Sequence, residues 1–190
     1  MLITLGIIGV VAALTMPALI GNYRKQEASV RMKKFYSTME QVIRRAEIDF
    51  GPSQYWTRPT RGIDTFNQYL APYMAIVKIQ DENSSTPTVY FEDGSFFQLH
   101  DGDCLDFVFD INGAKLPNAD GRDRFYFPMC FSETSREAWH GNKDKTFGTY
   151  EGLASNRTQA YSLCQSKPLY CSRLLQIDNW EIKNDFPQKF

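Results

Sequence analysis

The first twenty residues of the chain contain no charged side chain, although Asp, Glu, Lys and Arg make up 23% of its 190 residues. The chain also has no excess of positive charge, because 21 Lys and Arg stand against 22 Asp and Glu. A dedicated nucleic-acid-binding domain needs a basic surface and is therefore not expected. The 43% hydrophobic content excludes a disordered chain.

Histidine is scarce, and the common catalytic motifs are missing. His100 and His140 are the two histidines, and no GxSxG, HExxH, P-loop or GxGxxG pattern accompanies them. We expect both to be surface residues, and we do not expect an enzyme.

The four cysteines contain no CxxC pair, which leaves a zinc site or a thioredoxin-like motif without support. Disulfides formed in an oxidising compartment are the favoured interpretation, and four reduced core cysteines are the alternative. Of the three pairings, we favour Cys104 with Cys130 across neighbouring strands and Cys164 with Cys171 as a local clasp.

Residues 1–20 form an uncharged apolar run that can cross a bilayer as a helix, since about 20 residues span roughly 30 Å. A cleavable signal peptide is the alternative, but no basic n-region precedes the run. Proline within the run removes a backbone hydrogen bond and should kink the helix, while small residues allow another helix to approach. The positions of this helix that are expected to matter for its packing are Leu5, Gly6, Gly9, Ala13 and Pro17.

Residues 21–50 are predicted to continue this helix as an amphipathic segment that ends at Gly51-Pro52. Residues 1–50 would then be one rod of about 75 Å. Segment 21–50 carries a net charge of +3 and leaves −4 for the head, residues 51–190. The positive charges of segment 21–50, which we call the neck, would hold it in the cytoplasm. This conflicts with disulfides in the head, which form in an oxidising compartment. The apolar residues that recur at steps of three and four are Ala28, Met32, Phe35, Met39, Val42, Ala46 and Phe50.

The head is predicted to hold a short helix from an N-cap at Asp64 to Tyr73. Strands follow over 88–91, 95–100, 104–111 and 124–131, with Asp93-Gly94 and Asp101-Gly102 at tight turns. From 132 to 163 we expect a long loop, whose part with Trp139 and His140 is the better place for a partner-specific surface. The expected fold class is α+β, with a long N-terminal helix, membrane-spanning and then amphipathic, packed on a small antiparallel sheet.

Three further groups of residues are candidate sites. An oxygen-rich segment could bind calcium, although Ala114 and Lys115 stand where an EF-hand needs a ligand and a glycine, and turn chemistry is the alternative. The calcium candidates are Asp110, Asn112, Asn118, Asp120 and Asp123. An aromatic group is either a stacking surface or core, namely Tyr55, Trp56, Phe66, Tyr69 and Tyr73. Asn83-Ser84-Ser85 and Asn156-Arg157-Thr158 fit the N-glycosylation pattern, and both are expected to be chance matches.

The run LITLGIIGVVAALTMPALIGNYRKQ resembles the N-terminal stem of the type IV pilin and type II secretion pseudopilin superfamily. The head resembles pilin-like secretion proteins more loosely, through Asp110-Ile111-Asn112-Gly113, Pro117-Asn118, Gly121-x-Asp123, Cys171 and Asp178-x-Trp180-x-Ile182. The resemblance implies a structural filament subunit, anchored by a single pass in the bacterial inner membrane with its head in the periplasm. After assembly it would stand in a periplasmic or cell-surface filament.

The resemblance also implies partners and processing. The partners would be copies of the chain, other pilins or pseudopilins, membrane lipid, a prepilin peptidase, an inner-membrane platform protein and an assembly ATPase, with no nucleic acid. In this superfamily a basic leader ending in glycine, an N-methylated phenylalanine and a glutamate precede the apolar run. We expect them upstream of Met1, where a basic leader would also resolve the topological conflict. The alternative is a membrane-anchored extracytoplasmic adhesin or ligand-binding protein that does not polymerise.

Overall fold

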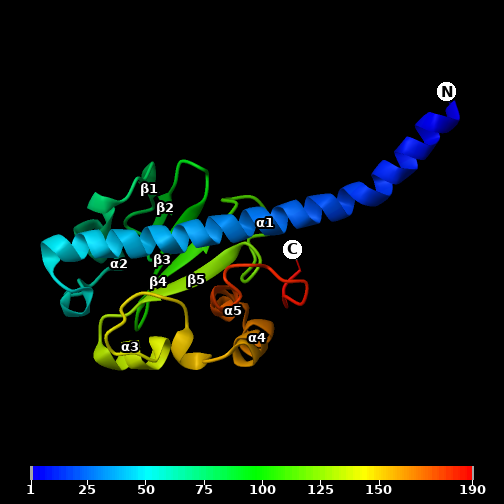
Figure 1. Cartoon of the computed structure of the whole chain (residues 1–190). Coiled ribbons are helices and arrows are strands. Elements are labelled where there is room, and N and C mark those ends of the chain that lie inside the picture. The colour runs from blue at the N-terminus through cyan, green and yellow to red at the C-terminus, as the bar shows by residue number, and fades with distance from the viewer. Residues whose placement is uncertain (1, 190) are drawn as a thin grey trace.

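The computed structural model describes residues 2–189 and shows one long helix laid across a face of an antiparallel sheet (Figure 1). Helix α1 runs without a break over Leu2–Phe50. It ends at Gly51, whose φ of +76° suits glycine and whose N–H donates to the Glu47 carbonyl at 3.0 Å. The predicted continuous helix is therefore confirmed over Leu2–Phe50, as is its end at Gly51.

The sheet has five antiparallel strands in the order β1-β2-β3-β4-β5. The four predicted strands are present with ends shifted by one or two residues, and both predicted turns join neighbouring strands. The short edge strand β1 was missing from the prediction, because three residues are too few to show an alternating pattern. The strands are β1 (Lys78–Gln80), β2 (Thr88–Tyr90), β3 (Phe96–Asp101), β4 (Leu105–Asp110) and β5 (Arg124–Met129).

Aromatic rings join α1 to the sheet. Phe35 stacks on Phe109 with ring centroids 4.2 Å apart, and it also contacts Phe127 at 5.2 Å. Alternation along each strand places these rings on the face that α1 covers. The predicted amphipathic face is buried from Ala28 to Ala46, whereas Phe50 remains 45% exposed. The head is thus held to the C-terminal part of α1 by one aromatic core.

The helical structure of two segments of the head differs from the prediction. The expected helix over 64–73 begins earlier, with α2 (Gly62–Thr65), and continues as a π-helical turn (Phe66–Leu70) and a 3₁₀ turn (Ala71–Tyr73). The predicted N-cap at Asp64 is wrong, because Arg61 occupies the cap and Asp64 lies in the first turn. Asp64 instead forms an ion pair with Arg61 at 2.7 Å.

The long loop predicted for 132–163 is also wrong. It contains α3 (Glu133–His140), a 3₁₀ turn (Glu151–Leu153) and most of α4 (Arg157–Ser166). Ser132 caps α3 by accepting from the Ser135 N–H at 3.0 Å, and Gly141 ends it at φ +64°. Further turns are Ser53–Tyr55 and Pro168–Tyr170, and α5 spans Cys171–Ile177.

Two disulfides close the head, and both are the favoured pairings. Cys104–Cys130 links the residue before β4 to the residue after β5, and Cys164–Cys171 links α4 to α5. All four cysteines lie in the head, outside the apolar run of residues 1–20.

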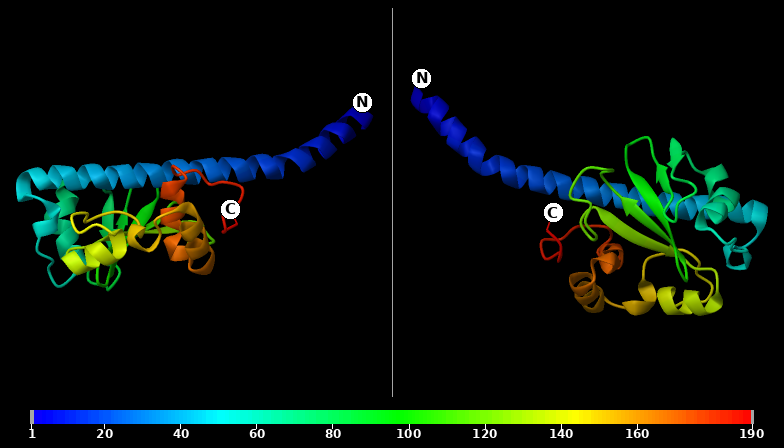
Figure 2. Two further views of the ribbon diagram at one scale, coloured as in Figure 1. Left: turned by 60° about the horizontal axis from the view of Figure 1, so that its bottom comes forward. Right: turned by 180° about the vertical axis from the view of Figure 1, so that it is seen from behind.

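The N-terminal part of α1 projects beyond the head and bends within its blue part (Figures 1 and 2). Within the residues that the structure describes, no helix is both long and apolar enough to cross a membrane. This differs from the membrane-spanning segment expected for residues 1–20. The backbone of Leu5, Gly6, Gly9, Ala13 and Pro17 lies in α1, but of their side chains only that of Ala13, which is exposed, lies inside the described part.

Candidate assembly surface and neighbouring sites

The projecting part of α1 carries exposed apolar side chains. Ala28 is the first residue along α1 that is buried among those whose burial the structure describes. Toward its N-terminus the helix projects beyond the head (Figure 2). The described large apolar side chains here are therefore open to solvent.

Four exposed apolar side chains of α1 form a single row, which we call the apolar stripe: Met16, Leu19 and Tyr23 before Ala28, and Val30 just after it. Their exposed fractions are 58%, 71%, 66% and 60%. Steps of three, four and seven residues place them on one side of a helix, opposite the face that packs on the sheet. Large exposed apolar rows of this kind mark surfaces that bind another protein or a membrane. Val30 does not stand out in the sequence, because it lies off the repeat of apolar residues that forms the core face.

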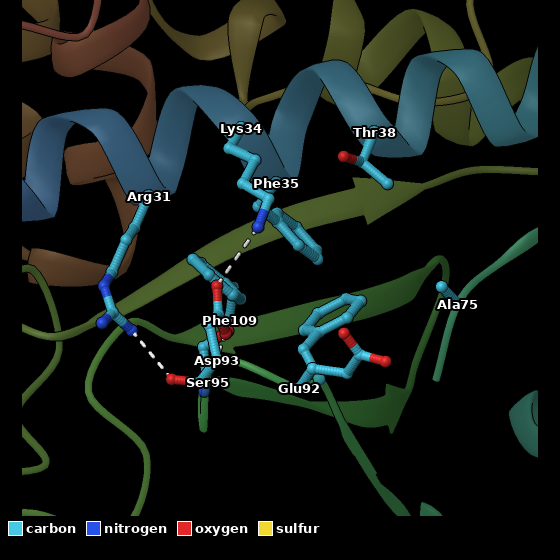
Figure 3. Close-up of a pocket in the computed structure, with 10 residues that line it drawn as sticks. Arg31, Lys34, Phe35, Thr38, Ala75, Glu92, Asp93, Ser95 and Phe109 are labelled. Carbon is cyan, nitrogen blue, oxygen red and sulfur yellow. Dashed lines mark hydrogen bonds and ion pairs between the residues drawn. The ribbon is translucent and has the colours of Figure 1, made fainter. Parts of the chain in front are cut away.

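A pocket of about 340 Å³ lies between α1 and the β2–β3 hairpin (Figure 3). Its lining includes three aromatic rings, those of Phe35, Phe91 and Phe109. Phe35 contacts both of the other rings, with centroids 6.2 Å and 4.2 Å away. The pocket thus offers an apolar interior beside the buried core.

Charged groups at the rim of this pocket pair with one another. Lys34 Nζ lies 3.4 Å from Asp93 Oδ2, and Arg31 Nη1 donates to the Ile111 carbonyl at 2.8 Å. Burial raises the pKa of Asp93, but bonds from Ser95 and the Lys34 charge outweigh it, so the net pKa is lowered. Because Asp93 and Lys34 neutralise each other, the rim has little net charge to attract an ion, and an apolar group fits best.

The calcium candidates lie in and beside the loop between β4 and β5. Carboxylate oxygens of two of them already accept hydrogen bonds from main-chain N–H groups. Asp123 accepts from the N–H of Asn118 at 2.8 Å and of Ala119 at 2.5 Å. Asp110 accepts from the Asn112 N–H at 3.1 Å. Burial raises the pKa of Asp110 to about 7, opposed by the Asn112 bond and reinforced by nearby Asp123.

The Asn118 side chain lies among acceptor oxygens of this loop, where a cation would otherwise bind. Its amide lies 3.1 Å from Asp110 Oδ2 and 3.1–3.2 Å from the carbonyls of Lys115 and Gly113. Since all three neighbours are acceptors, we assign the amide nitrogen to face them. Asp120 is turned to Arg124, 3.3 Å away. Among the described residues, no group of three or more His, Cys, Asp or Glu side chains could hold a metal ion.

Ionisable groups also line the other face of the sheet. His100 and Asp106 are paired across β3 and β4, and Tyr150 donates to Asp106 at 3.0 Å. Burial raises the pKa of Asp106 to about 6, and it lowers the pKa of His100.

The expected partner surface around Trp139 and His140 is part of the folded head. His140 is 3% exposed, with its ring nitrogens 3.1 Å and 3.2 Å from the carbonyls of Thr149 and Thr146. The prediction that His140 lies on the surface is therefore wrong. Trp139 packs edge-on against Tyr150 at 5.6 Å. The sequence does not reveal this packing, because α3 is short and mostly polar and has no long apolar repeat.

The aromatic group is mostly core. Trp56 stacks on Tyr69 with centroids 4.5 Å apart, and both are buried, as is Phe66. Tyr55 is 75% exposed and Tyr73 is half-buried, its hydroxyl donating to Asp49.

Fold and surface together define a small disulfide-closed α+β domain carried on one projecting helix with an exposed apolar row. The chain belongs to a family of unknown function, DUF6613, whose family model matches residues 18–190. No curated protein and no solved structure matches it. The matched region contains the neck, the pocket and the whole described head.

Proposed function

We propose that the chain is a structural subunit of a pilin-like filament, a type II secretion pseudopilus or a type IV pilus-related fibre. The observation that carries this proposal is the apolar stripe, an exposed row on the side of α1 that the head leaves uncovered. The stem resemblance and the uncharged run before Gly21 support it, as do two disulfides, which are typical of proteins outside the cytoplasm.

Packing between α1 helices of neighbouring copies would bury the stripe. Full burial of one such side chain is worth about 1.5–3 kcal/mol. Four of them are comparable with the roughly 4–15 kcal/mol that association costs in lost freedom. A contact between different faces of identical copies does not close into a ring unless the rotation allows it, so it propagates as a helical filament.

Before assembly, membrane lipid would cover the apolar end of α1, with the head in the periplasm. By resemblance, a prepilin peptidase, an inner-membrane platform protein and an assembly ATPase would process and extract the subunit. Other pilins or pseudopilins would be further partners.

The second candidate is a membrane-anchored extracytoplasmic ligand-binding protein that does not polymerise. The pocket between α1 and the β2–β3 hairpin favours it, because its aromatic interior is still open in the isolated chain.

Val30→Arg separates the two candidates, because Val30 belongs to the stripe but lies outside residues 1–20. Full chain is purified in detergent, the detergent is removed, and polymer is measured by sedimentation and negative-stain microscopy. We expect V30R to abolish polymer while the chain still fractionates with membranes. The matched control places the same charge on exposed Thr134 of α3 and should polymerise normally. A wild-type chain that stays monomeric without detergent would refute the filament proposal.

A further inference from the structure

The turn between β1 and β2 presents an asparagine with no structural task. Asp81 to Ser85 are all exposed, and Asn83 lies at the centre of this segment. The turn is closed by other groups, because Ser84 donates its N–H to the Asp81 carbonyl at 2.8 Å. Asp81 itself has a φ of +54°. Within the described part of the chain, the Asn83 side chain makes no hydrogen bond, so its amide is free to react.

The position of this turn makes it easy to open. Strand β1 lies at the edge of the sheet and pairs with β2 alone, over three residues. Short edge elements with few buried contacts open locally at low free energy. An enzyme that must bend the chain around Asn83 would therefore disturb little of the fold. The main bond to break is the one from Asn67 to Glu82, 2.9 Å long and exposed.

The second Asn-X-Ser/Thr triplet has the opposite character. Asn156 caps α4 by accepting from the Gln159 N–H at 3.0 Å, and loss of such a cap costs about 1 kcal/mol. Its neighbour Arg157 binds Asp178 at 2.8 Å and Asp185 at 2.9 Å. A transferase would have to unwind this helix end and break these bonds before it could use Asn156.

We infer that Asn83 is an acceptor site for an N-linked oligosaccharide and that Asn156 is not. The donor class is a polyprenyl-diphosphate-linked oligosaccharide on the outer side of the inner membrane. The inference rests on the extracytoplasmic location that is part of the proposed function. It replaces the chance interpretation of the Asn83 triplet, which used the sequence pattern without its surroundings.

The residues before each asparagine add a chemical difference. Asp81 stands two positions before Asn83, whereas Ala154 stands two positions before Asn156. A carboxylate there can form an ion pair with a cationic group of the transferase, whereas alanine cannot. Asp81 has no ion pair within the described residues, so its charge is available.

The transfer is a substitution at the first sugar. The Asn83 amide nitrogen attacks C1, a nitrogen–carbon bond forms, and the bond from C1 to the diphosphate oxygen breaks. Polyprenyl diphosphate leaves, and the amide proton passes to a carboxylate of the transferase. The β1–β2 turn lies toward the C-terminal end of α1, away from the projecting part (Figure 1). A glycan there leaves the apolar stripe uncovered.

The test uses the full oxidised chain, a purified bacterial single-subunit oligosaccharyltransferase and its lipid-linked oligosaccharide. Mass spectrometry should show the oligosaccharide mass on the peptide that contains Asn83 and none on the peptide that contains Asn156. Asn83→Gln should abolish the product, Asp81→Asn should reduce it at least tenfold, and the matched control Asn156→Gln should leave it unchanged. A synthetic acceptor peptide in parallel verifies that the enzyme is active.

An unmodified Asn83 in this reaction, or equal modification of Asn156, overturns the inference. The readout is independent of polymerisation. A chain that is modified but forms no filament removes the proposed function alone, and a chain that forms filaments but stays unmodified removes this inference alone.

Discussion

Replacing Phe35 should release α1 from the head. The Phe35 side chain is 3% exposed and contacts the rings of Phe91, Phe97, Phe109 and Phe127 at centroid distances of 4.2–6.2 Å. Truncation of a buried phenylalanine to alanine costs about 3–5 kcal/mol. Because four ring contacts disappear together, we expect Phe35→Ala to lose about 4–5 kcal/mol of the unfolding free energy. That is a large part of the roughly 5–15 kcal/mol that a domain has.

Urea unfolding of the full oxidised chain in a non-ionic detergent, followed by tryptophan fluorescence, measures this loss. Phe35→Leu keeps much of the volume and should cost less than about half as much. Gln41→Ala, on the exposed side of α1, is the matched control and should stay within about 0.5 kcal/mol. A loss below about 1 kcal/mol for F35A, with an unchanged dependence on urea, would refute the reasoning that this ring holds the helix to the sheet.

Three further predictions follow from the head and the stem. The pKa of Asp106 is raised to about 6 in the folded chain, so the fold disfavours its ionised form, and stability should fall as pH rises from about 4 to about 6. Asp106→Asn keeps an acceptor for the Tyr150 hydroxyl but cannot ionise. Denaturant midpoints measured across this pH range should therefore fall less for D106N than for the wild-type chain. Millimolar calcium or a chelator should leave the melting temperature unchanged, because the Asn118 amide already donates to Asp110 and to two carbonyls of the loop; an increase with calcium would contradict that assignment. Ala13→Arg should prevent both polymer formation and membrane retention, whereas a variant that still fractionates with membranes would show that this segment is not the anchor.

Local pattern was enough to predict most of the framework. Apolar residues from Ala28 to Ala46 mark the inner face of α1, since a helix repeats every 3.6 residues and must bury one side. Strands β2 to β5 alternate because one face meets α1, and glycine turns set the reversals. Spacing also indicated both disulfides, because Cys104 and Cys130 stand at facing ends of neighbouring strands.

Polar helices escaped the same reasoning. Helix α3 is defined by the cap at Ser132 and by Gly141, and these local bonds leave no apolar period to detect. The burial of His140 depends on carbonyls from the segment that follows it, so only the folded chain shows it.

Hydrophobic periods of 3.6 and 2 are properties of each segment alone, so the order of residues is enough to require a long amphipathic helix on a small antiparallel sheet. Which side chains stay exposed depends on how the segments pack in the folded chain. Met16 remains exposed because it lies before Ala28, the first buried residue in the described part of α1. Val30 remains exposed because the head covers only the opposite face of the helix there. Asn83 is free while Asn156 is bound for the same reason: identical triplets acquire different neighbours only when the chain is folded.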